Sequence, residues 1–377
     1  MLGSPLENHW INIAKGKVES LSERPASPVT KDLGENTVIL PAAVNTHAHL
    51  ELSQLTSPLE VPSRSMPDWI PPLLAFRRSA GYDAVQGIQQ AMHRPELLES
   101  TIAVADIIPP MLKRADGRQQ TAADAIDSVP SSAAGLHWLP FAELIAWRSE
   151  AANNISCPHT FGLSPHAPHT VCPALLEKAI KQNVPIAMHL AETPAELQLL
   201  RHHTGPLVEM MRHADPDYDP KSVLVGKRPF DYLQLLSAAP SVLIVHGNYL
   251  DDEELRFLAA HRDRMSVVYC PRSHAYFRHT PYPLQKMLDY GVRVLLGTDS
   301  LASTPNLSLA EEMQWVLQYH PTIPAEQVYR LGTLEGATAL GLPRECGTIQ
   351  PGSPARFIVL HVKRGQIGRF CSAPTGK

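Results

Sequence analysis

Eight short apolar runs recur along the chain from residue 38 onward, and most of them are followed by a segment with helical patterning. Apolar strands that alternate with helices predict a parallel sheet whose strands are buried on both faces. A chain of 377 residues closes such a sheet most simply as a (β/α)₈ barrel of the TIM type, so we predict that fold within the α/β class. An open doubly wound sheet is the alternative, but no glycine-rich phosphate-binding motif follows any run. The runs are residues 38–45, 102–108, 136–141, 160–164, 185–189, 242–246, 265–270 and 292–297.

The two ends of the chain have strand patterns of their own. Residues 10–18 alternate about a Lys-Gly-Lys turn and predict a hairpin, and residues 357–362 predict a strand that would pair with it. We therefore predict a small β-sandwich appendage built from both termini. Its two parts would be residues 1–37 and 345–377, and the barrel would take residues 38–344.

The composition argues against several classes of partner. Lysine and arginine total 33 against 37 aspartates and glutamates, a net charge of −4, so nothing favours nucleic acid or an anionic membrane. No apolar run is long enough to span a bilayer, and the first residues lack the pattern of a signal peptide. The five cysteines are widely spaced without a CxxC pair, which favours a reducing compartment. We expect a cytoplasmic protein that binds a small-molecule substrate.

Polar residues that can bind a metal close several of the apolar runs. His47 and His49 are two apart at the end of the first run, so both side chains point the same way. His189 closes the fifth run, His246 the sixth and Asp299 the eighth. Because barrel active sites form at the C-terminal ends of the strands, these groups would meet and would suit one divalent metal ion such as Zn²⁺. The alternative, histidines with a purely structural role, must explain why polar groups end several buried strands.

Glu192 and His166 follow strand ends as well. Glu192 lies three residues past His189 and can reach over a metal without binding it. A metal lowers the pKa of its water to near 7, and a neighbouring carboxylate can pass that proton to a ring nitrogen or a leaving amine. A solvated glutamate before the next helix is the alternative. The fourth run leads into Ser164-Pro165-His166-Ala167-Pro168-His169 without the lysine that bridges two metals in some barrels. This favours a single ion and places His166 or His169 for substrate contact, with a rigid loop as the alternative.

Six motifs occur in an order that resembles the amidohydrolase superfamily. They are residues 44–51 (VNTHAHLE), 164–168 (SPHAP), 189–193 (HLAET), 246–247 (HG), 269–273 (YCPRS) and 297–300 (GTDS). The resemblance is to the branch of cytosine, S-adenosylhomocysteine, guanine and aminodeoxyfutalosine deaminases and triazine chlorohydrolases. Residues 50–53 and 270–277 look most like proteins grouped with aminodeoxyfutalosine deaminase.

The resemblance implies roles for residues of this chain. Asp299 would accept a proton from the attacking water, Glu192 would protonate a ring nitrogen of the substrate, and His246 would orient and polarise the hydroxide. The implied ligands of one zinc or iron ion are His47, His49, His189 and Asp299. The implied substrate-facing residues are His166, Arg272, Ser273 and His274.

The helix after Trp69 departs from the family pattern. Nucleoside-type relatives tend to have a ribose-binding carboxylate there, whereas this chain has Arg77 and Arg78. A guanidinium at this place could bind a substrate carboxylate in a bidentate way, and two solvated helix charges are the alternative.

The resemblance implies a mononuclear metal-dependent hydrolase that acts on carbon–nitrogen bonds. We expect it to deaminate a nucleoside or purine-like ring, as aminodeoxyfutalosine deaminases do, with release of ammonia. A chlorohydrolase or a cyclic-amide hydrolase with the same site is one alternative, and a catalytically silent metal-binding barrel is another. Dimers are common among such relatives, so a homodimer is possible.

Overall fold

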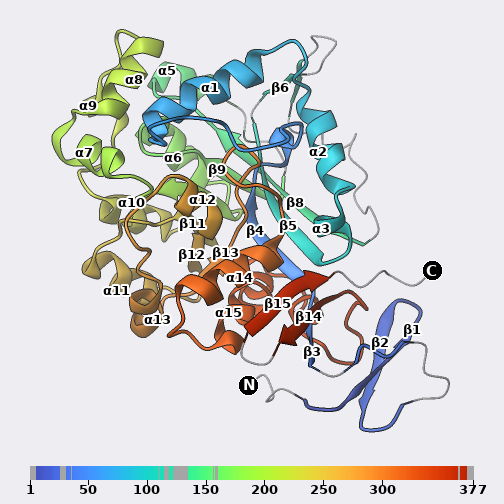
Figure 1. Ribbon diagram of the computed structural model, residues 1–377. Coiled ribbons are helices and arrows are strands. Elements are labelled where there is room, and N and C mark those ends of the chain that lie inside the picture. The colour runs from blue at the N-terminus through green and yellow to red at the C-terminus, as the bar shows by residue number, and fades with distance from the viewer. Residues whose placement is uncertain are drawn as a thin grey trace.

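A closed barrel of eight parallel strands forms the centre of the molecule (Figure 1). The computed structural model describes residues 6–25, 31–34, 36–109, 111–113, 119–121, 135–155, 157, 160–363 and 366–371. Ala48 in the first barrel strand pairs in parallel with Asp299 beyond the last, which closes the sheet and confirms the predicted fold class. The strands, in sheet order, are β4 (Ala43–Ala48), β5 (Thr101–Ile108), β8 (His137–Leu144), β9 (Gly162–Pro165), β10 (Ile186–Leu190), β11 (Val242–His246), β12 (Met265–Tyr269) and β13 (Val294–Leu296).

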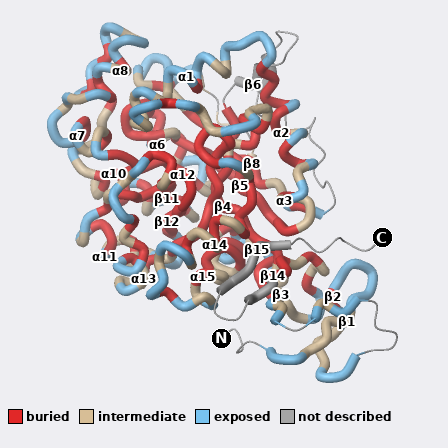
Figure 2. Tube along the Cα trace, viewed as in Figure 1, coloured by how far each residue is buried: buried red, intermediate tan, exposed pale blue. Residues whose placement is uncertain are grey.

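Helices surround the barrel and leave its strands buried (Figure 2). Several begin at an N-cap that was recognisable in the sequence: the side chains of Thr193 and Ser308 each accept a hydrogen bond from a backbone N–H three residues later. The longer helices are α1 (Met66–Arg78), α2 (Ala84–Met92), α6 (Pro173–Ile180), α7 (Pro194–His202), α8 (Pro206–Ala214), α10 (Pro229–Leu236), α11 (Asp252–Ala260), α13 (Leu284–Tyr290), α14 (Leu309–Tyr319) and α15 (Ala325–Leu331). The shorter ones are η1 (Leu50–Leu52), α3 (Pro95–Leu98), α5 (Ser149–Asn154), α9 (Pro220–Val223), α12 (Pro271–Tyr276), α16 (Leu334–Ala339) and η2 (Arg344–Gly347).

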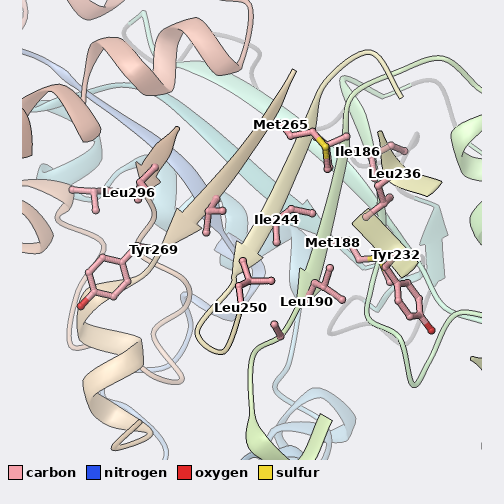
Figure 3. Close-up of a cluster of buried hydrophobic side chains, with 14 of the residues drawn as sticks. Ile186, Met188, Leu190, Tyr232, Leu236, Ile244, Leu250, Met265, Tyr269 and Leu296 are labelled. Atoms are coloured by element: carbon pink, nitrogen blue, oxygen red, sulfur yellow. The ribbon is translucent and has the colours of Figure 1, made fainter. Parts of the chain in front are cut away.

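Alternation along the strands decides which side chains face the barrel interior. In β10, Ile186, Met188 and Leu190 pack outward against α10, as Figure 3 shows. Ala187 belongs to a separate core cluster inside the barrel, and His189 is two residues further on the same face. Each fully buried aliphatic side chain stabilises the fold by about 1.5–3 kcal/mol. The outward core therefore holds β10 in a register that turns His189 into the barrel.

Antiparallel sheets from both ends of the chain lie at one side of the barrel (Figure 1). The predicted hairpin is confirmed as β1 (Trp10–Ala14) and β2 (Lys17–Ser22). The predicted strand 38–45 is two strands: β3 (Thr37–Pro41) pairs with β14 (Phe357–Lys363), and β4 begins after Ala42 and joins the barrel. The C-terminal strand β14 therefore pairs with β3 and with β15 (Gln366–Cys371), and not with the hairpin.

A short hairpin of β6 (Met111–Lys113) and β7 (Gln119–Thr121) lies between β5 and β8 in the chain. Parts of the predicted terminal segments 1–37 and 345–377 fall outside the described residues. Within the described part of the chain, none of the helices combines the length and the apolar character that crossing a bilayer requires.

Candidate active site

The predicted metal ligands meet at the mouth of the barrel, the end at which the strands finish. The ring centroid of His47 lies 4.9 Å from that of His49 and 5.1 Å from that of His189. The Nε2 atoms of His47 and His49 are 3.8 and 3.9 Å from Oδ1 of Asp299. His246 is also close, with its ring centroid 5.7 Å from that of His47. Four separate strand ends thus converge on one point, as the barrel prediction required.

Hydrogen bonds between the first and last strands place His47 and Asp299 side by side. The Asn45 side chain donates to Oγ1 of Thr298 at 2.8 Å and accepts from the Thr298 N–H at 3.2 Å. The Asp299 N–H donates to the His47 carbonyl at 3.0 Å. These bonds cross 250 residues of sequence and are part of the barrel closure, so the ligand geometry depends on the whole fold.

Two of the site residues have a left-handed backbone conformation. His246 has φ 69° and Asp299 has φ 60°, a conformation that non-glycine residues adopt only rarely. Ala191, directly before Glu192, has φ 54°. Residues held in this conformation are found disproportionately at functional sites, where the surrounding contacts impose the turn.

The donor set fits a divalent metal ion. Both ring nitrogens of His47 are buried and lack a hydrogen-bond partner among the described residues, which a metal would supply for one of them. His189 donates through Nδ1 to the His166 carbonyl at 3.0 Å, so its Nε2 is the nitrogen left for a metal. Burial lowers the pKa of His47 and of His49 well below the usual value, so both rings are neutral and can ligate. Two overlapping groups have ligand atoms mutually close enough to share an ion: His47, His189 and His246, and His47, His49 and Asp299.

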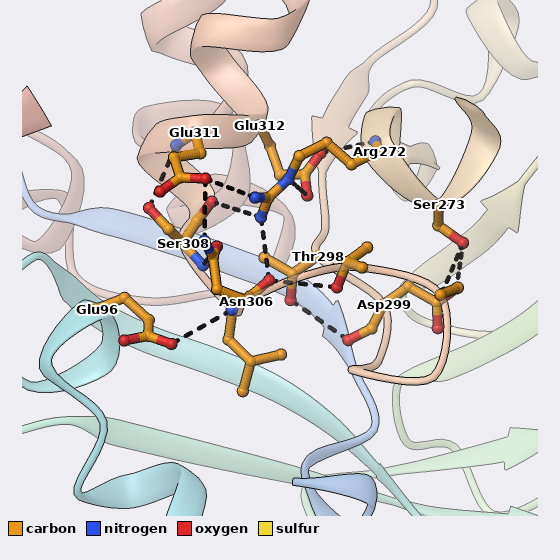
Figure 4. A network of polar contacts seen from close by, with 12 residues as sticks. Glu96, Arg272, Ser273, Thr298, Asp299, Asn306, Ser308, Glu311 and Glu312 are labelled. Atoms are coloured by element: carbon orange, nitrogen blue, oxygen red, sulfur yellow. Dashed lines mark hydrogen bonds and ion pairs between the residues drawn. The ribbon is translucent and has the colours of Figure 1, made fainter. Parts of the chain in front are cut away.

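Two serine hydroxyls fix the Asp299 carboxylate (Figure 4). Ser273 and Ser303 both donate to Oδ2, at 2.6 and 3.0 Å. Burial raises the pKa of Asp299 to about 6, and the two serine hydrogen bonds oppose that shift. Since Oδ2 is used by the serines, Oδ1 is the oxygen that faces the histidines. The resemblance placed Ser273 on the substrate, but the structure places its hydroxyl on a ligand carboxylate.

Arg272 does not face the barrel mouth in the manner that the resemblance implied. Its guanidinium is buried and forms ion pairs with Glu312 at 2.6 Å and with Glu311 at 2.7 Å, and it also donates to two backbone carbonyls. These contacts tie α12 to the start of α14 (Figure 4). Four of the five guanidinium N–H groups are bonded within the protein, so Arg272 stabilises the turn that carries Ser273.

Glu192 and His246 form the most suggestive polar pair of the site. Oε1 of Glu192 lies 3.3 Å from Nε2 of His246. Burial, followed by the charges of Asp299 and Glu196, raises the pKa of Glu192 well above its usual range. The Glu196 carboxylate accepts hydrogen bonds from the N–H groups of Glu192 and Ala191, which fixes the backbone at this point. A rigidly held carboxyl group that keeps its proton can act as an acid toward a substrate.

A comparison with protein families settles the affiliation. The model of the amidohydrolase family matches residues 149–369, more than half of the chain. The chain belongs to the amidohydrolase family. The resemblance of its motifs is thereby confirmed.

Individual relatives agree with this affiliation. The chain is 26% identical to a 5-methylthioadenosine/S-adenosylhomocysteine deaminase of Syntrophomonas wolfei over 360 residues, which cover 89% of this chain and 75% of that protein. Among solved structures it is similar to the aminofutalosine deaminase of Helicobacter pylori in complex with methylthio-coformycin, with a TM-score of 0.73 at 19% identity over 95% and 88% of the two chains. It is also similar to the atrazine chlorohydrolase of Arthrobacter aurescens complexed with zinc, with a TM-score of 0.68 at 18% identity over 94% and 83%. These structural likenesses show the amidohydrolase fold.

Two predicted substrate-facing histidines lie beside the metal group of this amidohydrolase. The His166 ring is 5.0 Å from that of His189, and its Nδ1 is hydrogen-bonded to the Thr170 hydroxyl at 2.8 Å, which leaves Nε2 for another partner. His274 is buried, and its Nε2 has no hydrogen-bond partner in the described part of the chain. Its ring centroid lies 5.7 Å from that of Tyr269, the last residue of β12.

Arg77 has a partner that the sequence analysis missed. Its Nε and Nη2 donate to Oε1 of Glu51 at 3.1 and 2.5 Å, and the hydroxyl of Tyr82 donates to the other carboxylate oxygen. Glu51 is fully buried and lies two residues after His49, a predicted metal ligand. Arg77 is therefore not the solvated helix charge that we considered. A glutamate inside an apolar segment, next to a ligand motif, was the available signal for this pair.

Proposed function

We propose that this amidohydrolase is a hydrolytic deaminase of a nucleoside or purine-like ring that releases ammonia. The observation that carries the proposal is the buried Glu192 carboxyl, 3.3 Å from His246 and beside a histidine–aspartate group able to hold a metal. The Syntrophomonas relative, which matches over most of both chains, is named as a nucleoside deaminase. The aminodeoxyfutalosine-like motifs at residues 50–53 and 270–277 support a nucleoside with a modified remote part.

The proposed cofactor is one divalent ion, zinc, with iron as the alternative that suits the same donors. Its ligands would be His47, His49, His189 and Asp299. When bound, such an ion supplies Lewis-acid activation of water near neutral pH. No lysine ends β9, the strand next to Glu143, so the lysine that bridges two metals in some barrels is missing from that position.

Three side chains of the protein have separate roles in the proposed reaction. Glu192 donates the proton held on its carboxyl to the substrate ring nitrogen, which makes the adjacent amidine carbon electrophilic. His246, through Nε2, orients and polarises the nucleophile. Asp299 accepts the proton that the nucleophile releases, and the serine hydrogen bonds to Oδ2 keep that carboxylate in place. Asp299 then passes the proton taken from the water to the amino group. The C–N bond breaks, ammonia leaves, and Glu192 takes up the hydroxyl proton as the carbonyl forms.

Ammonia release from zinc-loaded protein tests the proposal directly. The panel would hold adenosine, 5′-deoxyadenosine, 5′-methylthioadenosine and an aminated nucleoside with an acid group. We expect at least one to give stoichiometric ammonia. Release of chloride from a chlorotriazine, or of ring-opened product from a cyclic amide, with no ammonia from the panel would replace deamination by one of the alternatives. No product from any of these compounds, with a Glu192→Gln variant that binds ligands and matches wild type in this background turnover, would support the silent barrel.

The remaining expectations are part of the same proposal. We propose a small-molecule substrate with no nucleic acid or membrane partner, in keeping with the net charge of −4, and a cytoplasmic location. A homodimer is the assembly to test, by light scattering of the zinc-loaded protein. Separate terminal segments 1–37 and 345–377 around a barrel of residues 38–344 remain the proposed domain division.

A further inference from the structure

Glu143 is a buried carboxylate that none of the steps above uses. It lies at the end of β8, two and four residues after Phe141 and Leu139, which pack in the core cluster inside the barrel. Alternation along the strand therefore turns Glu143 into the barrel at its mouth. The residue is only 3% exposed. Burying a carboxylate costs free energy unless the group is paired, so its presence at this position calls for a binding partner.

Among the described residues, no hydrogen bond or ion pair joins another group to the Glu143 carboxylate or to the hydroxyl of its neighbour on the next strand. Across the parts of the chain that the structure describes, no side chain or N–H is hydrogen-bonded or ion-paired to the Glu143 carboxylate. Ser164 of β9 pairs with Glu143 in the parallel register, so the two side chains lie on the same face of the sheet. The Ser164 hydroxyl is also buried and also lacks a partner among the described residues. Buried polar groups are nearly always hydrogen-bonded, so two adjacent unpartnered ones at a site mouth point to a ligand.

The charges around Glu143 indicate which kind of ligand. Burial raises the pKa of Glu143, and the charges of Arg77, on α1, and of His189 oppose that shift. Arg77 is already bonded to Glu51 through two of its nitrogens. The Arg77 guanidinium is thus engaged by Glu51 and forms no ion pair with Glu143 among the described residues, so this side of the mouth has an excess of hydrogen-bond acceptors. Such a place favours ligand O–H donors and disfavours the substrate carboxylate that the sequence analysis considered for Arg77.

We propose that Glu143 and Ser164 bind the sugar hydroxyls of the substrate, with Glu143 accepting from a vicinal diol. A carboxylate has two oxygens that can accept from two neighbouring hydroxyls, and the Ser164 hydroxyl can donate back to one of them. The inference rests on the proposed function, because a nucleoside supplies both the ring for Glu192 and the diol for Glu143. It makes Glu143 a specificity-determining residue and not a participant in the chemical step.

Removal of the diol from the substrate and of the acceptor from the protein should have the same effect. We would compare adenosine with 2′,3′-dideoxyadenosine on zinc-loaded wild type, Glu143→Gln and Ser164→Ala. A lost hydrogen bond to a charged group corresponds to roughly 10- to 100-fold in affinity. Glu143→Gln should lower kcat/KM for adenosine by that factor, mainly through KM, and leave the dideoxy compound nearly unchanged. Ser164→Ala should show the same selectivity with a smaller loss.

The matched control is Glu150→Gln, which removes an exposed carboxylate from α5, the helix that follows β8. It should leave both substrates unchanged. Glu143→Asp keeps the charge on a shorter side chain, and its intermediate loss would show that the acceptor matters if Glu143→Gln fails to fold. An equal loss on both substrates in a folded Glu143→Gln variant would assign Glu143 a structural role and overturn the inference.

Ligand binding separates this inference from the proposed function. Calorimetry with inosine and 2′,3′-dideoxyinosine measures diol recognition without turnover. We expect tighter binding of inosine by wild type and a loss of that preference in Glu143→Gln. If the panel releases no ammonia but this preference appears, the deaminase proposal fails while Glu143 keeps its role. If ammonia is released and the diol preference survives in Glu143→Gln, the inference fails and the deaminase proposal stands.

Discussion

The two sides of the barrel mouth differ in how completely the protein satisfies its own polar groups. On the β13 side, Asp299 is held by two serines, and the segment that carries Ser273 is itself held by the ion pairs of Arg272. On the β8 and β9 side, the buried Ser164 hydroxyl has no partner among the described residues. The neighbouring Glu143 carboxylate is buried with only the charges of Arg77 and His189 acting on it. The difference indicates that a side chain expected to bind the metal must be fixed by hydrogen bonds from its neighbours. A side chain expected to bind substrate must instead keep its hydrogen-bonding atoms free.

The largest effect should follow the loss of a metal ligand. Asp299→Ala and His47→Ala each remove a donor from the group at the mouth, so we expect metal content and ammonia release to disappear together. Metal analysis after dialysis, beside the ammonia assay, measures both. Asp289→Asn, an exposed aspartate of α13, is the matched control and should keep both. Full metal content in Asp299→Ala would remove this carboxylate from the ligand set.

Loss of the proton donor should separate rate from metal binding. Glu192→Gln keeps the shape of the side chain and removes its acid, so we expect full metal content and a rate lower by about 10²–10⁴-fold. Inosine binding should remain, because the groups proposed to recognise the sugar are intact. A rate within a few-fold of wild type would contradict the role of Glu192 as the acid.

Loss of a hydrogen bond to the ligand carboxylate should give a smaller effect. Ser273→Ala leaves Oδ2 of Asp299 with Ser303 alone, and the loss of such a supporting contact typically costs about 10- to 100-fold in metal affinity or activity. A chelator competition measures the affinity for zinc. Ser222→Ala, at an exposed position in α9, should change nothing. A raised KM with unchanged zinc affinity would return Ser273 to the substrate, as the resemblance implied.

The sequence predicted the features that depend on local patterns and missed those that depend on contacts between distant segments. The barrel and the residues of the metal group depend on local patterns: apolar strand length, period-two alternation and polar residues at strand ends. Val242–His246, for example, is the observed strand as well as the predicted one. The pairing of β3 with β14, and the bonds of Arg272 to Glu312 and of Arg77 to Glu51, join residues that only the folded loops bring together. No periodicity encodes such contacts, so the ion pairs of Arg272 were not predicted and Glu143 was overlooked.

The smallest effect should come from loss of the N-cap of α7, because Thr193 supports Glu192 only through Glu196. Thr193 accepts a hydrogen bond from the Glu196 N–H at 3.1 Å, and the Glu196 carboxylate in turn holds the backbone of Glu192. Thr193→Ala removes the cap, which costs about 0.5–2 kcal/mol of folding free energy. Buried Leu199 and Leu200 keep the rest of the helix in place, so kcat should fall by less than about 3-fold with zinc content unchanged.

A melting curve and steady-state kinetics of Thr193→Ala measure these two quantities together. Thr193→Ser, which restores a capping hydroxyl, should return most of the lost stability. A fall in kcat as deep as that of Glu192→Gln, without loss of zinc, would show that the position of Glu192 depends on this one cap. The position of Glu192 would then depend on a single hydrogen bond at the start of α7. The two sides of the mouth would differ less in how firmly the protein holds its polar groups than the contacts of Asp299 and of Glu143 indicate.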